Sequence, residues 1–337
     1  MSLTKISPRK NDLKDLLYKQ DFVLMEAAVG EYLQRQTPVQ VDSVLGSLSC
    51  IYDPAGRQAL QELYTSFFAL ASKNSVPLLI TAPTWRANAR NIGQIKIPAT
   101  ANRDALEFIH QVRTKIGSGH VPDVLLGGLL GPCFDAYRPD LGLSAQAARD
   151  FHAWQVEELA QAGAEYLMAA TLPALEEAKG MAQVMTRTQV PSVISFVTNK
   201  QGCLLDGHTL AQAIEAIDEL CTPRPVGYMI NCSYPSFFHP DKEPAWIFSR
   251  LIGFQANASS LEHHELDEAD EVHADDIHDW GDRLLHLHHR YGLKILGGCC
   301  GTGVEHLAYL VHNRHRSGEK RTPHGVTTNG NKPRSIS

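Results

Sequence analysis

The chain has 337 residues, with 43% hydrophobic and 20% charged side chains, the balance of a soluble globular protein large enough for a substantial core. A formal net charge of -6, without a basic patch interleaved with aromatic residues, argues against a nucleic-acid partner. No apolar stretch could span a membrane and the first 14 residues lack the apolar core of a signal peptide, so we expect a cytoplasmic protein.

Eight short apolar runs recur along the chain, most of them followed by a segment of helical character. In chain order they are Phe22–Ala28, Pro77–Thr84, Asp123–Gly131, Tyr166–Pro173, Ser192–Thr198, Val226–Ser233, Leu251–Asn257 and Leu293–Gly301. Apolar runs without strict alternation fit parallel strands that are covered on both faces. The repeat predicts the α/β class, and eight units favour a single-domain (β/α)₈ TIM barrel over an open doubly wound sheet.

Three stretches fall outside this repeat. Residues 1–19 are expected to form an N-terminal extension, residues 20–315 the barrel, and residues 316–337 a flexible polar tail. The acidic, His-rich segment Leu261–Trp280 falls between the seventh and eighth strands, where long loops cover sites in barrels. It is predicted to be a solvated loop; the alternative is a second metal site formed by His263, His264, His273 and His278.

Three of the seven cysteines lie at the ends of two predicted strands. Cys232 ends the sixth strand, and Cys299 and Cys300 end the eighth within a Gly-rich run. The C-terminal ends of parallel strands are where α/β proteins build their sites. Three thiolates brought together there indicate a Zn²⁺ site with one coordination position left open. No disulfide framework is expected. The other four cysteines are expected to be small buried apolar residues: Cys50, Cys133, Cys203 and Cys221.

Zinc held by three thiolates suits one kind of chemistry better than others. It is a poor Lewis acid for splitting water, but it can bind a substrate thiol and keep it deprotonated near neutral pH. The natural reaction is then attack of that sulfur on an electrophilic carbon, which needs no general base, so no catalytic residue beyond the metal site is predicted. Thr84 and Trp85, at the end of the second strand, are candidates for substrate binding, although a Trp packed under a loop is the alternative.

The run Gly297–Thr302 (GGCCGT), with the upstream pair Asn231-Cys232, resembles the zinc-binding signature of the homocysteine S-methyltransferase family. Weaker similarity covers about residues 20–312, including Leu24–Arg35 and Leu79–Asn88. The resemblance implies a barrel with zinc at its C-terminal mouth. It also implies transfer of a methyl group from a sulfonium or similar donor to a thiol such as homocysteine, as in methionine biosynthesis. Three residues would then lie at the substrate: Glu26, Ala27 and Asn231.

The chain departs from the family pattern at two places. The first-strand motif, usually Asp-Gly-Gly or Asp-Gly-Ala, is Glu26-Ala27-Ala28 here. The fourth strand, which usually ends with Glu-Thr, carries Ala170 where the family's glutamate would grip the substrate ammonium. A methyltransferase for a different thiol, or a non-catalytic relative that binds zinc or a thiol, are therefore alternatives. The expected partners are a small-molecule thiol and a methyl donor, with the oligomeric state left open.

Overall fold

The computed structural model describes residues 12–116, 123–262 and 274–316. All eight predicted strands are present in it. They form one closed parallel barrel in sequence order, so the predicted (β/α)₈ fold is confirmed. The barrel closes where β1 pairs with β8, with Val23 opposite Ile295. The strands are β1 Val23–Met25, β2 Leu78–Thr81, β3 Val124–Leu130, β4 Tyr166–Leu172, β5 Ser192–Phe196, β6 Gly227–Ser233, β7 Leu251–Ala256 and β8 Ile295–Gly298.

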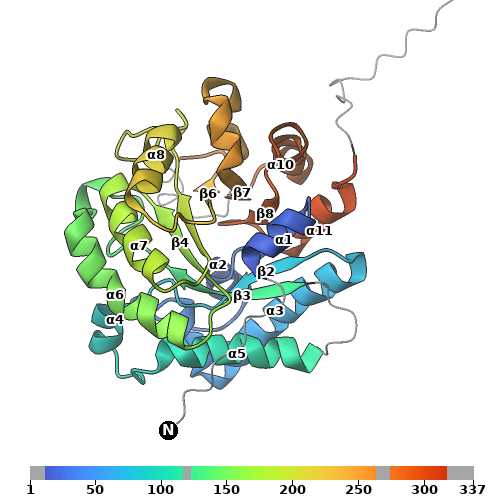
Figure 1. Cartoon of the computed structure of the whole chain (residues 1–337). Coiled ribbons are helices and arrows are strands. Elements are labelled where there is room, and N and C mark those ends of the chain that lie inside the picture. Colours follow the sequence, from blue (N-terminus) through green and yellow to red (C-terminus); the bar gives the residue numbers. More distant parts are fainter. Residues whose placement is uncertain (1–11, 117–122, 263–273, 317–337) are drawn as a thin grey trace, which may run out of the picture.

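Helices surround the strands, and several begin at residues that cap them well (Figure 1). The side chain of Asp53 accepts from Gly56 N at the start of α3, and Thr209 and Gln212 form a capping box at the start of α8. The α-helices are α1 Leu13–Lys19, α2 Gly30–Gln36, α3 Pro54–Asn74, α4 Ala89–Gln94, α5 Ala101–Ile116, α6 Ala145–Gln161, α7 Leu175–Arg187, α8 Leu210–Leu220, α10 Ile277–Tyr291 and α11 Val304–Asn313.

The barrel interior is filled by alternate strand residues. Val23, Met25 and Ile295 point inward, whereas Leu24 packs outward against the helices. Two residues of α1, Leu13 and Leu16, belong to the same interior cluster, so this part of the predicted N-terminal extension packs with the barrel rather than apart from it. None of the helices in the described ranges is long and apolar enough to cross a membrane.

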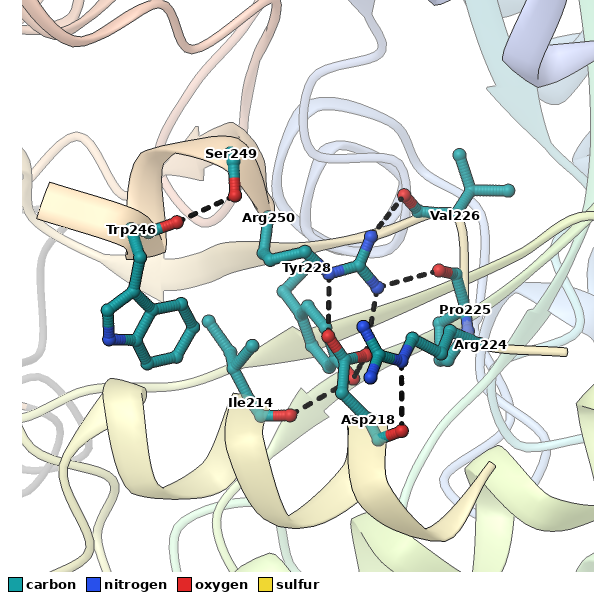
Figure 2. Close-up of polar contacts among 9 residues, drawn as sticks. All are labelled: Ile214, Asp218, Arg224, Pro225, Val226, Tyr228, Trp246, Ser249 and Arg250. Carbon is teal, nitrogen blue, oxygen red and sulfur yellow. Dashed lines mark hydrogen bonds and ion pairs between the residues drawn. The ribbon is translucent and has the colours of Figure 1, made fainter. Parts of the chain in front are cut away.

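A buried polar network ties α8 to the starts of β6 and β7 (Figure 2). The Asp218 carboxylate accepts from Arg250 Nε at 2.7 Å and Nη2 at 2.9 Å, and from the Tyr228 hydroxyl at 2.8 Å. Arg250 also donates to the carbonyl oxygens of Pro225 and Val226. The bidentate pair is largely removed from water, with side-chain exposures of 21% and 9% for Arg250 and Asp218.

We expect Asp218→Ala to destabilise the folded chain strongly, because it leaves the Arg250 guanidinium and the Tyr228 hydroxyl without their acceptor. Breaking a buried pair costs about 3–5 kcal/mol, and the partial exposure of Arg250 places this variant near the lower figure. Urea unfolding of the variant beside Asp140→Ala measures the effect. Asp140 pairs with Arg138 on the surface, with both side chains more than half exposed, so that control should change little. Equal effects of the two substitutions would contradict the expectation.

Candidate metal centre

The three predicted metal ligands converge at the C-terminal mouth of the barrel. Cys232 lies within β6 near its end, and Cys299 and Cys300 follow β8 directly. Their Sγ atoms all lie within 4.8 Å of one another, and no other such group of potential ligands occurs in residues 12–116, 123–262 and 274–316. Cys232 is buried, whereas the other two are half-buried and face the cavity. The three cysteines that the sequence singled out therefore form one cluster that could hold a metal ion.

Two of these cysteines are joined in the structure. A disulfide links Cys232 to Cys299, with Cα atoms 5.3 Å apart, and Cys300 is free. The sequence did not indicate this bond, which is the consequence of bringing two thiols to one point. After reduction the donor set fits zinc, because two sulfurs of a tetrahedral site lie about 3.8 Å apart when each zinc–sulfur bond is about 2.3 Å. The disulfide would have to be reduced before all three sulfurs could hold a metal ion.

The backbone around the cysteines is unusual in ways that explain the motif. Cys232 has a φ of 51°, so the chain turns within the end of β6 and redirects its side chain. A Cβ on Gly297 would lie 2.9 Å from the carbonyl oxygens of Met25 and Glu26, and therefore only glycine allows β8 to approach β1 this closely. The turn after β8 is held by Thr302, whose hydroxyl donates to Cys299 O at 2.6 Å.

Asn231 orients the side chain of Cys232 through a hydrogen bond. Its amide nitrogen donates to Cys232 Sγ at 3.4 Å and to Thr171 Oγ1 at 2.7 Å. Its carbonyl oxygen accepts from Thr171 N at 2.8 Å and from Ser195 Oγ at 2.7 Å. A donor aimed at the sulfur stabilises the thiolate form, and the remaining bonds fix the amide in that direction. Asn231 was predicted to bind substrate, and these contacts favour a positioning role instead.

Cys300 lies among groups of mixed charge. Burial, followed by the nearby Glu31 carboxylate, raises the pKa of its thiol to about 12. The Arg35 guanidinium and a hydrogen bond with the Tyr137 hydroxyl oppose this increase in pKa. The backbone N–H of Cys300 donates to Asn257 Oδ1 at 3.1 Å, which fixes the turn. A thiol this reluctant to ionise alone becomes a ligand when a cation stabilises its thiolate.

A cavity of about 390 Å³ opens beside the cysteines. Its wall brings together four of the five predicted substrate-binding residues with the metal ligands: Glu26, Ala27, Trp85, Asn231, Cys232, Cys299 and Cys300. Thr84 is the exception. It is fully buried behind the wall, where its hydroxyl donates to Leu129 O at 2.8 Å and accepts from Leu129 N at 3.0 Å. Thr84 does not line the cavity, because the turn after β2 directs its side chain toward β3.

Glu26 is 5% exposed and lies at the end of β1. Its Oε2 accepts from Thr81 N at 3.0 Å, and its Oε1 accepts from the Thr81 hydroxyl. Burial raises the pKa of Glu26 from its ordinary value of 4.5 to about 8, although both hydrogen bonds from Thr81 oppose this shift. Thr81 was not singled out from the sequence, although its place as the last residue of a strand could have marked it.

The opposite wall is built around Trp85, whose Nε1 donates to Ala170 O at 3.3 Å. The Arg86 guanidinium carbon lies 5.4 Å from the centre of the Trp85 ring, in a cation–π arrangement. Ala170 lies on the cavity wall and offers no carboxylate. Tyr137 reaches the cavity from the segment between β3 and α6, and no pattern in the sequence marks it.

The alternative of a second metal site in the His-rich segment falls largely outside the described residues. His278 lies in the first turn of α10, with its ring 5.1 Å from that of Tyr309. The other three histidines of that hypothesis, His263, His264 and His273, lie outside the described residues.

Fold and site together define the chain as a (β/α)₈ protein with a cluster of three cysteines at the mouth of its barrel. The sequence profile of the homocysteine S-methyltransferase family matches residues 23–313, almost the entire barrel. The chain therefore belongs to the homocysteine S-methyltransferase family, a family of methyltransferase enzymes.

Individual relatives are distant but match over their full length. The homocysteine S-methyltransferase of Escherichia coli (strain K12) is 22% identical over 319 residues, which cover 90% of this chain and 98% of the relative. Homocysteine S-methyltransferase YbgG of Bacillus subtilis (strain 168) is 21% identical over 321 residues, covering 89% and 97%. The metallated crystal form of the homocysteine methyltransferase MmuM from Escherichia coli has a TM-score of 0.71 at 20% identity, covering 90% of this chain and 100% of MmuM. An oxidised form of MmuM has a TM-score of 0.70, with the same identity and coverage.

Proposed function

We propose that this chain is a zinc-dependent S-methyltransferase that moves a methyl group from a sulfonium or similar donor to a thiol such as homocysteine. The observation that carries the proposal is the meeting of three cysteine sulfurs on the wall of one cavity. Membership in the family supports the reaction class. Three thiolates favour zinc over harder cations, and they leave the fourth position to the substrate sulfur. A reducing compartment such as the cytoplasm would keep the cysteines in the form that binds the metal.

Cys232, Cys299 and Cys300 would hold the zinc ion, which when bound lowers the pKa of a coordinated thiol and makes its sulfur nucleophilic near neutral pH. Asn231 keeps Cys232 in place through its bond to Sγ. Trp85, whose ring donates a hydrogen bond to Ala170 O, forms part of the wall against which the reactants would lie. The cavity would therefore hold the two small molecules in a fixed orientation beside the cysteines.

The transfer itself balances without a further group from the protein. The acceptor thiol loses its proton to solvent, its sulfur forms a bond to the methyl carbon, and the bond between that carbon and the donor sulfur breaks. A sulfonium donor leaves as a neutral thioether. Because a bound zinc ion would lower the pKa of the thiol, the transfer needs no histidine or carboxylate as a base.

The test combines metal content with turnover. Protein reduced and supplied with zinc should retain about one equivalent through sulfur ligands, and should convert homocysteine to methionine with S-methylmethionine or S-adenosylmethionine as donor. Retention of zinc without methyl transfer to any thiol would leave the non-catalytic relative as the correct assignment. Failure to retain zinc after full reduction would overturn the proposal.

A further inference from the structure

The carboxylates of the cavity wall are already engaged. Both oxygens of Glu26 accept from Thr81. Glu31 accepts from Gly301 N through Oε2 and pairs with Arg35 Nε at 3.1 Å through Oε1. Ala170 contributes no charge, and its carbonyl oxygen accepts from Trp85. Among the described residues, this wall therefore offers no free carboxylate to a substrate ammonium.

The same wall carries one cation in the described part of the chain, Arg86, and its guanidinium is unpaired there. No hydrogen bond or ion pair joins that guanidinium to another described residue, and the side chain is exposed at the cavity. A guanidinium is always charged and presents a planar set of donors that matches a carboxylate. The Arg86 guanidinium lines the cavity and forms no hydrogen bond or ion pair with a described residue, so it can bind an anion there.

Arg86 is nevertheless held in place. Its carbonyl oxygen accepts from Asn91 Nδ2 at 3.0 Å, which fixes the backbone before α4. Its guanidinium carbon lies over the Trp85 ring, and that ring is itself anchored to β4 by the bond to Ala170 O. A side chain that is already ordered loses little conformational entropy on binding a ligand, so the arrangement favours recognition over chance exposure.

We propose that Arg86 binds the carboxylate of the acceptor, and that the site therefore selects a mercapto-carboxylic acid without requiring an amino group. The inference rests on the proposed thiol methylation at the three-cysteine centre and adds the substrate class. The acceptor sulfur would lie at the cysteines and its carboxylate at Arg86, across one continuous cavity. An unengaged guanidinium gives the carboxylate a charge-assisted partner, whereas the two carboxylates of the wall, Glu26 and Glu31, already have protein partners.

Three thiols with the same carbon chain distinguish the contribution of the amino group to binding from that of the carboxylate. Homocysteine carries both groups, γ-mercaptobutyrate lacks the amino group, and homocysteamine lacks the carboxylate. Calorimetric titration of the reduced, zinc-loaded full chain with each thiol measures binding without relying on turnover. We expect γ-mercaptobutyrate to bind at least as tightly as homocysteine, and homocysteamine to bind roughly tenfold more weakly or worse.

Arg86→Gln keeps a side chain of similar reach and removes the charge. It should weaken the binding of both carboxylate thiols roughly tenfold or more and leave the binding of homocysteamine unchanged. Arg86→Lys, which keeps the charge, should lose less affinity for the carboxylate thiols. Arg103→Gln is the matched control, because Arg103 is an exposed arginine on α5 that does not line the cavity. Its affinities for all three thiols should equal those of the unchanged protein.

Two results would overturn the inference while leaving the proposed function intact. One is homocysteine binding tenfold or more tightly than γ-mercaptobutyrate, since that requires a site for the ammonium. The other is Arg86→Gln binding the carboxylate thiols as well as the unchanged protein does. If the zinc-loaded protein binds none of the three thiols, the proposed function itself is wrong and the inference falls with it.

Discussion

Serine in place of any one of Cys232, Cys299 and Cys300 is expected to abolish metal retention and methyl transfer while leaving the barrel folded. Each substitution removes one of three ligand sulfurs, and a hydroxyl is a far poorer ligand for zinc than a thiolate. Even outer-shell changes around a metal reduce its affinity about 10–100-fold, so loss of a ligand should exceed that range. The three positions lie at strand ends on the cavity wall, apart from the packed core, and serine is nearly isosteric with cysteine.

Metal content per chain after reduction and dialysis, together with circular dichroism, measures both parts of this expectation. Cys133→Ala and Cys203→Ala are the matched controls, because neither residue lines the cavity, and both should keep about one equivalent of zinc. Full retention of zinc by the Cys300→Ser variant would show that Cys300 is not a ligand. Global unfolding of Cys232→Ser would instead identify a site that stabilises the fold, as structural zinc does.

The fold could be predicted from the sequence because parallel strands covered on both faces must be continuously apolar. The predicted runs were longer than the strands, as with Phe22–Ala28 against β1 Val23–Met25. The extra residues are apolar for another reason: Ala27 and Ala28 turn away from the β-ladder and line the cavity. The clustering of the cysteines was predictable for a related reason, since strand order alone brings Cys232 and Cys299 to one mouth of the barrel.

The sequence could not predict how side chains in the connecting segments are oriented, because that depends on the geometry of each loop. Thr84 and Trp85 are adjacent, yet the turn after β2 buries Thr84 against Leu129 and leaves Trp85 on the cavity wall. Tyr137 reaches the site from a segment without periodicity. Successive side chains of a strand point to opposite faces, so the strand pattern predicts their direction; a loop has no such regularity. Thr84 is therefore the one predicted substrate-binding residue that does not line the cavity, although Trp85 beside it does.

Replacing Glu26 with glutamine is expected to stabilise the folded chain at alkaline pH and to remove a component of its pH dependence. In the folded chain burial raises the pKa of Glu26 to about 8 from its ordinary value of 4.5. Between these values the unfolded chain carries an ionised Glu26 and the folded chain a neutral one, so the folded state binds the extra proton. Stability due to this group is therefore present below about pH 4.5 and is lost as the pH rises to about 8.

The size of the loss follows from the shift, since one pKa unit corresponds to about 1.4 kcal/mol. Urea unfolding of the reduced, zinc-loaded chain at pH 5 and pH 8 should thus find Glu26→Gln more stable than the unchanged protein by several kcal/mol at the higher pH, and by little at the lower. Glutamine can still accept from Thr81 N, as Glu26 does. Glu157→Gln, at an exposed position on α6, is the control that should leave the pH dependence as it is.

The outcome bears directly on which substrate charge the cavity accepts. Because burial raises the pKa of Glu26 to about 8, this carboxyl would have to lose its proton before it could pair with an ammonium, whereas the Arg86 guanidinium is already charged and can bind a carboxylate. If the unchanged protein and Glu26→Gln instead show the same dependence of stability on pH, Glu26 is ionised in the folded chain. It would then be available to the amino group of homocysteine, and it would compensate for the carboxylate that Ala170 does not provide.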